Sequence, residues 1–300
     1  MIRRIVQRWA AKRAASIKPP SKRVAVMVPL PTPALGADEE VSMRQLREHL
    51  NHYDKFLLVP RGMKHEFAGF RAIELDRRHF GSAANHNRML YLPEFWELFS
   101  DYEYVLMYHL DALVFSDLLA DWCGKGYDFI GAPFLNCPDS PWVRVERVGN
   151  GGFALYRVPA VLGVLWNRYR LRPAKYFEDH FWRWLEWQGK VLKPVRAAAA
   201  RRFKHGRASG LRGILKRLDH VEANELQNDC FWADEAKRYH PGFKVAPLED
   251  GLRFAFEVAP PVCLERNGGN MPFGCHAWAR YDKTFWMDKL GIETHGHSHS

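Results

Sequence analysis

Two short apolar runs separated by a helical stretch constrain the fold of this chain most strongly. Val24 to Pro29 reads Val-Ala-Val-Met-Val-Pro, and Lys55 to Pro60 reads Lys-Phe-Leu-Leu-Val-Pro. Continuous apolar runs of this length are typical of strands buried on both faces. Between them, helical spacing of apolar residues predicts a helix from Ser42 to His52. Strand, helix and strand in this order predict a parallel βαβ unit.

A third apolar run, from Tyr104 to Leu110, is followed directly by Asp111. Such a run predicts a central strand, and in open α/β sheets the ligand crevice lies at the carboxyl ends of the strands. Further strands are expected over 127–132, 152–157 and 243–247, and further helices over 87–99, 158–169 and 229–239. The fold class is therefore α/β, with a Rossmann-type, mostly parallel central sheet flanked by helices in one large domain.

Length and cysteine content narrow the class of protein. A chain of 300 residues can bury a large core and an internal cleft. No run approaches the roughly 18 uninterrupted apolar residues of a membrane-spanning helix, so we expect neither a transmembrane segment nor a secretory signal. The five cysteines include no Cys-x-x-Cys pair, which argues against a disulfide framework and a structural zinc site. A reducing, cytoplasmic setting fits best.

Positive charge is concentrated in two stretches of the chain. Residues 1–23 and 195–218 together hold 16 of the 44 Lys and Arg residues and no acidic residue, which leaves 28 basic against 34 acidic residues elsewhere. The first stretch has four apolar residues at helical spacing, followed by a Pro-Pro pair: Ile2, Ile5, Val6 and Trp9. This pattern is typical of a basic amphipathic helix that lies on an anionic surface.

The basic stretches also support a function from another class, a binding module that holds RNA or an anionic membrane and catalyses nothing. Few aromatic residues alternate with the basic residues in these stretches, which argues against a surface that stacks on the bases of a nucleic acid. Positive charge confined to two appendages suits docking of an enzyme at the inner face of the cytoplasmic membrane. The location of the arginines, in a central crevice or on the appendages, distinguishes the two functions.

Two stretches near the predicted central strand could carry chemistry. Asp111 ends an apolar strand, where a charge needs compensation, and a divalent cation bridging a diphosphate would supply it. The alternative is that Asp111 caps a helix beginning near Leu113. Asn150 stands among Gly149, Gly151 and Gly152, which permit positive φ and close approach of the backbone to a ligand. A plain tight turn would use the same residues.

Two later residues are candidates for catalysis and for metal binding. Asp229 opens an apolar helical stretch, where it either caps the helix or serves as a general base for an acceptor hydroxyl. His276 lies in Pro272-Phe273-Gly274-Cys275-His276-Ala277-Trp278 and either closes a metal site or is an ordinary core histidine. A glycoside hydrolase with Asp111 and Asp229 as its acid and base is a third possibility, although the Gly-Asn-Gly-Gly loop fits a nucleotide-sugar site better.

In their order and spacing, four motifs resemble the DUF5672 family, whose members are similar to GT-A glycosyltransferases. The resemblance spans residues 24–290 and also includes Asn87-Arg88-Met89-Leu90. The four motifs are Tyr104 to Phe115, Tyr127 to Pro133, Gly149 to Phe153 and Pro272 to Trp278.

The resemblance implies a nucleotide-diphosphate sugar donor and a Mn²⁺ or Mg²⁺ ion. Asp111 would be the second acid of an Asp-x-Asp-like motif and His276 a later ligand of the same metal. His109 stands at the first acid position, where its imidazole can also bind Mn²⁺. Donor-binding positions would also include Asn87, Arg88, Asn150, Gly151 and Gly152. Asp229 would be the general base that inverting members of the fold use, and without a base at this position the enzyme would be retaining.

The sequence pattern and the resemblance together predict an organisation and an acceptor. Residues 1–23 would form a basic amphipathic segment, 24–150 the nucleotide-sugar-binding half, and 151–290 the acceptor half with a basic insertion at 195–218. Residues 291–300 would be a flexible, histidine-containing tail. The acceptor would be a glycan or a lipid-linked glycan of the bacterial cell surface.

Overall fold

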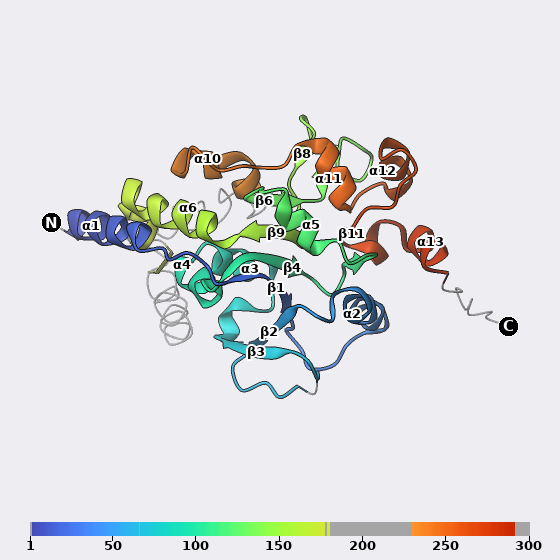
Figure 1. Cartoon of the computed structure of the whole chain (residues 1–300), viewed down its shortest axis with the longest axis horizontal. Helices are drawn as coiled ribbons and strands as arrows, with labels where there is room; N and C mark the ends of the chain where they lie inside the picture. The colour runs from blue at the N-terminus through green and yellow to red at the C-terminus, as the bar shows by residue number, and fades with distance from the viewer. Residues whose placement is uncertain (1, 66, 178, 181–229, 292–300) are drawn as a thin grey trace, which may run out of the picture.

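The computed structural model describes residues 2–65, 67–177, 179–180 and 230–291 as a mixed α/β protein. Its centre is a six-stranded sheet in the order β3-β2-β1-β4-β9-β6, with helices flanking it (Figure 1). The first four strands of this order run parallel, whereas β9 is antiparallel to both β4 and β6. The expected α/β class and the mostly parallel central sheet are therefore confirmed.

The strands of the central sheet match the predicted apolar runs. The sheet consists of β1 Lys22–Pro29, β2 Asp54–Pro60, β3 Arg71–Leu75, β4 Tyr102–Tyr108, β6 Phe129–Gly131 and β9 Phe153–Arg157. In β1, the four residues from Ala25 to Val28 are completely buried, as expected for a strand covered on both faces. The helix α2, Ala37–Leu50, connects β1 to its parallel neighbour β2, so the predicted βαβ unit is confirmed.

Helices and short strands complete the described part of the chain. The other helices are α1 Ile2–Ala15, α3 Ala83–Leu90, α4 Pro93–Trp96, α5 Leu119–Gly124, α6 Val158–Leu171, α10 Ala236–Tyr239, α11 Leu248–Phe254, α12 Pro260–Arg266 and α13 Trp278–Leu290, with 3₁₀ turns η1 Arg77–His79 and η2 Glu97–Phe99 and the π-helical η3 Phe231–Glu235. There are also two small sheets. One has three strands, β10 Ala255–Phe256, β11 Gly274–Cys275 and β5 Leu113–Val114, and the other pairs β7 Pro133–Phe134 with β8 Arg147–Val148. Within the described ranges no helix is both long and apolar enough to cross a membrane.

Three expectations about local structure are wrong. The helix expected over 87–99 is interrupted, because Pro93 cannot continue α3 and instead opens α4. The strand expected over 243–247 is reduced to one bridge between Phe129 and Val245. Leu113 lies in a strand, so Asp111 does not cap a helix there.

The sheet order creates a switch point beside the central strand. Strand β1 lies between β2 and β4: the connection from β1 leads to β2 on one side, whereas the connection from β3 leads back to β4 on the other side. Ligands of open α/β sheets bind outside the carboxyl ends of strands at such a point. Beyond β4, a smaller core joins the β5–β11–β10 sheet to α12 and α13 around Trp278 and Trp286. This arrangement brings a late segment of the chain to the edge where β4 ends.

The helix α1 packs on the protein along one side. Val6 and Ala10 are buried, and the Trp9 ring meets Trp166 of α6 at 4.8 Å between centroids. Figure 1 shows α1 and α6 side by side at one end of the molecule. The predicted amphipathic helix is therefore present, but Val6 belongs to the protein interior and is not available to an external surface.

Asp54 links the amino ends of four strands, and we expect this linkage to make stability depend on pH. Its carboxylate accepts from Lys22 Nζ at 2.7 Å and Tyr102 OH at 2.6 Å, and it pairs with Arg71 Nη2 at 2.8 Å. The hydrogen bonds from Lys22 and Tyr102 lower the pKa of Asp54 to about 2. A depressed pKa means that the stabilisation is present above pH 4 and is lost as the pH falls toward 2.

The prediction is tested with Asp54→Asn in urea unfolding at several pH values. Because the group is half-exposed, the variant should lose only about 1 kcal/mol of unfolding free energy at pH 7. The difference from wild type should shrink between pH 4 and pH 2, where the wild-type carboxyl also becomes neutral. A difference that stays constant over this range would contradict the assignment.

Candidate active site

A tight turn at the end of β4 presents two of the predicted metal ligands. The Ala112 amide donates to the His109 carbonyl at 2.9 Å, which closes a β-turn with Leu110 and Asp111 at its centre. Leu110 is buried, whereas the Asp111 side chain is 55% exposed. Leu110 therefore holds the turn in the core, while the Asp111 side chain remains accessible to solvent.

The third predicted ligand, His276, reaches the turn through strand pairing. In the antiparallel pair of β11 and β5, Cys275 lies opposite Leu113. The Trp278 amide then donates to the Asp111 carbonyl at 3.1 Å. Ala277, which stands between His276 and Trp278 in the sequence, adopts a left-handed φ of 51°. This pairing places His276 beside Asp111 although 165 positions of sequence separate them.

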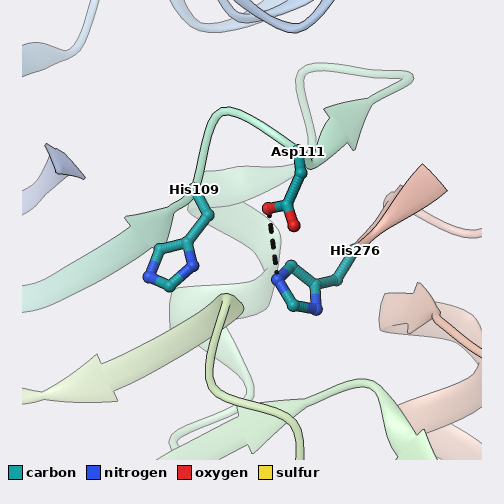
Figure 2. Close-up of side chains that lie close together, drawn as sticks. All are labelled: His109, Asp111 and His276. Carbon is teal, nitrogen blue, oxygen red and sulfur yellow. Dashed lines mark ion pairs between the residues drawn. The ribbon is translucent and has the colours of Figure 1, made fainter. Parts of the chain in front are cut away.

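The three side chains converge on one point (Figure 2). His276 Nε2 lies 3.3 Å from Asp111 Oδ1, and the His109 and His276 rings are 5.6 Å apart between centroids. One ligand atom from each of His109, Asp111 and His276 lies within 4.8 Å of the others. The structure thus brings together the residues that the sequence suggested as metal ligands.

Two polar residues behind His276 fix its orientation. His276 Nδ1 donates to Glu257 Oε1 at 3.0 Å, and Asn150 Nδ2 donates to the same oxygen at 2.6 Å. The Asn150 side-chain oxygen accepts from the Gly152 amide at 2.9 Å. Imidazoles that bind metals commonly use the second nitrogen in this way. Glu257 was not predicted, and Asn150, which was expected to line a sugar pocket, has both ends of its amide bonded within the protein.

Charge at the cluster is distributed around His276. Burial by itself would lower the pKa of His276, but the adjacent Asp111 and Glu257 carboxylates raise it to about 10. Although the Asp111 side chain is half-exposed, the protein around its carboxyl displaces water and opposes ionisation, yet the neighbouring imidazolium lowers the pKa of this carboxyl to about 2. Without a bound cation, the site therefore holds one positive imidazole between two carboxylates.

A further histidine, which the sequence did not predict, contacts the cluster through His109. His86 of α3 lies with its Nε2 3.3 Å from His109 Nε2. Burial lowers the pKa of His109 to about 3 and that of His86 to about 4, so both rings are neutral at pH 7. Neutral imidazole is the form that binds metal. The predicted donor contacts Asn87 and Arg88 follow His86 on the same helix.

The glycines of the Gly149–Gly152 loop give close packing. None of them has positive φ, so that expectation is wrong. A Cβ on Gly149 would lie 1.9 Å from the Phe134 ring, and a Cβ on Gly152 would lie 1.9 Å from His276 Nε2. Gly152 is therefore required by a protein side chain at the site, and its carbonyl also accepts from the His109 amide at 2.9 Å. Gly151, predicted to contact the donor, is half-buried beside it.

Three predicted features lie wholly or mostly outside the described residues. They are Asp229, the expected general base, the basic insertion at 195–218, and the tail at 291–300, of which only residue 291 is described. Their assigned roles remain predictions from the sequence.

The chemistry of the cluster fits a divalent cation. His276 Nε2 is buried, and apart from its ion pair with Asp111 it has no hydrogen-bond partner among the described residues. The backbone of Gly152 packs so closely against this nitrogen that a Cβ there would lie 1.9 Å from it. Two imidazoles and one carboxylate are suitable donors for Mn²⁺ and other transition ions, whereas Mg²⁺ prefers oxygen ligands alone.

Comparisons with known proteins place the chain in a family. The model of a protein family of unknown function, DUF5672, matches residues 69–276. The chain belongs to the DUF5672 family. All three residues of the cluster lie in the matched segment of this DUF5672 protein, and His276 is the last residue of the match. No curated protein matches the sequence.

Two solved structures of glycosyltransferases are similar to this chain at low identity. The apo form of glycosyltransferase GlyE from Streptococcus pneumoniae TIGR4 is 13% identical, with a TM-score of 0.36, over 85% of this chain and 54% of that chain. The mannosyltransferase Ktr4p from S. cerevisiae in complex with GDP is 13% identical, with a TM-score of 0.25, over 44% of this chain and 49% of that chain. The chain spans about half the length of both.

Proposed function

We propose that this protein is a GT-A type glycosyltransferase that moves a sugar from a nucleoside-diphosphate donor to a hydroxyl group of a glycan or lipid-linked glycan. One observation carries the proposal: the convergence of His109, Asp111 and His276 where β4 ends, beside the switch point of the sheet. Ligands of open α/β sheets bind at this place. The motif order of the sequence, which resembles GT-A enzymes, assigns the same residues to the metal.

The chemistry of sugar transfer explains why the donors should gather here. Departure of a nucleoside diphosphate develops negative charge, and a divalent cation supplies the compensating positive charge. Asp111, His276 and His109 would hold this cation, and His276 would be kept in position by Glu257. In this proposal Asp229 takes the proton of the acceptor hydroxyl, which an Asp229→Asn variant with unchanged turnover would contradict.

Thermal unfolding with nucleoside diphosphates tests the proposal. UDP, GDP, CDP and dTDP are each added with Mn²⁺, with Mg²⁺ or with a chelator. We expect one nucleotide to raise the midpoint by about 5 °C at 100 times its dissociation constant. The shift should require a cation and should be larger with Mn²⁺ than with Mg²⁺, because two of the three donors are imidazoles.

Two aspartate variants give this experiment its control. Asp111→Ala should abolish the cation-dependent shift, whereas Asp121→Ala, which removes an exposed carboxylate from α5, should retain it. If no nucleotide stabilises the protein, or if both variants respond like wild type, the glycosyltransferase proposal is wrong. Release of free sugar from the matching nucleotide sugar would then extend the result from binding to reaction.

The donor set also supports a second candidate, a mononuclear non-haem iron enzyme. Two histidines and one carboxylate with open positions are the ligands that bind Fe²⁺ in such oxygenases. The position of the cluster at the switch point of an α/β sheet favours the nucleotide-sugar function. Stabilisation by Fe²⁺ under anaerobic conditions, with no effect of any nucleotide, would favour the oxygenase.

A further inference from the structure

The side of α1 that faces away from the protein combines apolar and basic residues. Ile2 and Ile5 are 62% and 56% exposed. Arg4, Arg8 and Lys12 are also exposed, and their spacing of four residues places them in one row along the helix. We refer to these five residues as the α1 outer face. Arg4 and Arg8 lie opposite the buried Val6 and Ala10, which pack toward α6, and Ile5 and Lys12 flank them. Ile2 stands one turn before Val6, at the exposed start of the helix.

The cations of the α1 outer face are not used by the described part of the protein. No ion pair or hydrogen bond involves the side chains of Arg4, Arg8 or Lys12 among residues 2–65, 67–177, 179–180 and 230–291. Arg13 of the same helix contrasts with them, because it pairs with Glu97 and lies 5.3 Å from the centre of the Trp166 ring. The helix contains no acidic residue. Its inner side therefore anchors it, while its outer side has unbalanced positive charge.

From this we infer that the α1 outer face docks on an anionic lipid surface. Isoleucine side chains that extend from a helix can enter the boundary between headgroups and acyl chains, while adjacent cations bind lipid phosphates. Figure 1 shows α1 at one end of the long axis of the molecule, beside α6. Docking would be peripheral and would depend on salt, since the cations act within a Debye length.

The exposed isoleucines favour a lipid surface over a nucleic acid as the partner of α1. Arginine and lysine bind phosphates of either kind, and this contact alone does not discriminate. Single-stranded nucleic acids gain affinity from stacking on aromatic rings, which isoleucine cannot supply. The aromatic residue of α1, Trp9, already packs against Trp166 and Tyr176. The exposed side chains of Ile2 and Ile5, on the same helix as this basic row, gain free energy only where they can leave water.

Vesicle flotation with the full chain tests this inference. Vesicles contain either phosphatidylcholine alone or a mixture of phosphatidylcholine and phosphatidylglycerol. We expect binding to the anionic vesicles only, weakened by added NaCl. Replacing Arg4, Arg8 and Lys12 by glutamine should reduce partitioning about 100-fold, since each cation near the surface contributes a factor of about five. Ile2→Ser with Ile5→Ser should also reduce it while leaving net charge unchanged.

A matched variant separates the α1 outer face from overall charge. Replacing Arg44, Lys64 and Lys237 by glutamine removes the same charge from exposed positions elsewhere and should leave vesicle binding unchanged. The inference is overturned if the α1 variant binds like wild type, or if the matched variant loses binding equally. It is also overturned if a short single-stranded RNA binds with the same dependence on Arg4, Arg8 and Lys12, and vesicle binding ignores the serine substitutions. Circular dichroism melting checks that every variant folds.

Discussion

Gly152→Ala is expected to abolish cation binding at the His109–Asp111–His276 cluster and to reduce any metal-dependent turnover at least about 1,000-fold. The added methyl group would lie 1.9 Å from His276 Nε2, the atom that faces Asp111. The imidazole must then leave its position, and with it the hydrogen bond to Glu257. Calorimetric titration with Mn²⁺ measures the loss directly. Steric overlap in this packed region should also lower stability by about 1–3 kcal/mol.

Gly163→Ala is the matched control for this substitution. Gly163 lies in α6, and a Cβ there would have no heavy atom within 4 Å. The control should therefore bind Mn²⁺ like wild type and be more stable by about 0.5–1 kcal/mol, because alanine is favoured over glycine inside a helix. Undiminished Mn²⁺ affinity in a folded Gly152→Ala protein would show that His276 does not need its present position to bind the cation.

The central sheet could be predicted because its main strands are continuous apolar runs in the sequence. Val24 to Pro29 and Lys55 to Pro60 are buried on both faces, so burial and sequence pattern coincide. Short strands such as β5, β10 and β11 have only two residues each, which is too few to show a period. Their pairing depends on contacts between distant segments, and it is this pairing that delivers His276 to Asp111.

The candidate site could be predicted in part for the same reason. Asp111 was predicted as a metal ligand because it is a carboxylate at the end of an apolar strand. Glu257 has the same signal, an acidic residue directly after the apolar run that ends β10, and it could have been found by that rule. His86 gave no comparable signal, because it lies in a half-buried helix and meets His109 only through tertiary packing. For the glycine loop, the expected positive φ is absent, and two of its glycines are instead explained by close packing against Phe134 and His276.

Four separate segments supply the cluster and its support. The turn after β4 provides His109 and Asp111, the loop before β9 provides Asn150, and the ends of β10 and β11 provide Glu257 and His276. The hydrogen bonds run in series from Gly152 through Asn150 and Glu257 to His276, so a change at one member alters the position of the next. Residues that never touch a ligand should therefore control its affinity.

Glu257→Gln tests this dependence with a substitution of nearly equal size. The side-chain oxygen of the new glutamine can still accept a hydrogen bond from His276 Nδ1. The glutamine lacks the negative charge that makes the imidazole a stronger ligand, and its NH₂ group can take the place of the accepting oxygen. We expect Mn²⁺ affinity to fall about 10- to 100-fold, the usual effect of removing a second hydrogen-bond partner from a metal-binding histidine. Titration calorimetry with Mn²⁺ measures this affinity, and unfolding in urea measures stability in the same sample.

Asp250→Asn separates a role in positioning His276 from a general effect on folding. Asp250 is also a buried carboxylate, and it accepts from Tyr127 OH at 2.7 Å and pairs with Lys125 at 3.4 Å. Its loss should lower stability and leave Mn²⁺ affinity unchanged, because Asp250 contacts none of the cluster residues through these bonds. Equal loss of Mn²⁺ affinity in both variants would mean that global destabilisation, and not the orientation of His276, explains the effect of Glu257→Gln. A selective loss at Glu257 would instead identify it as the residue that fixes the imidazole toward Asp111.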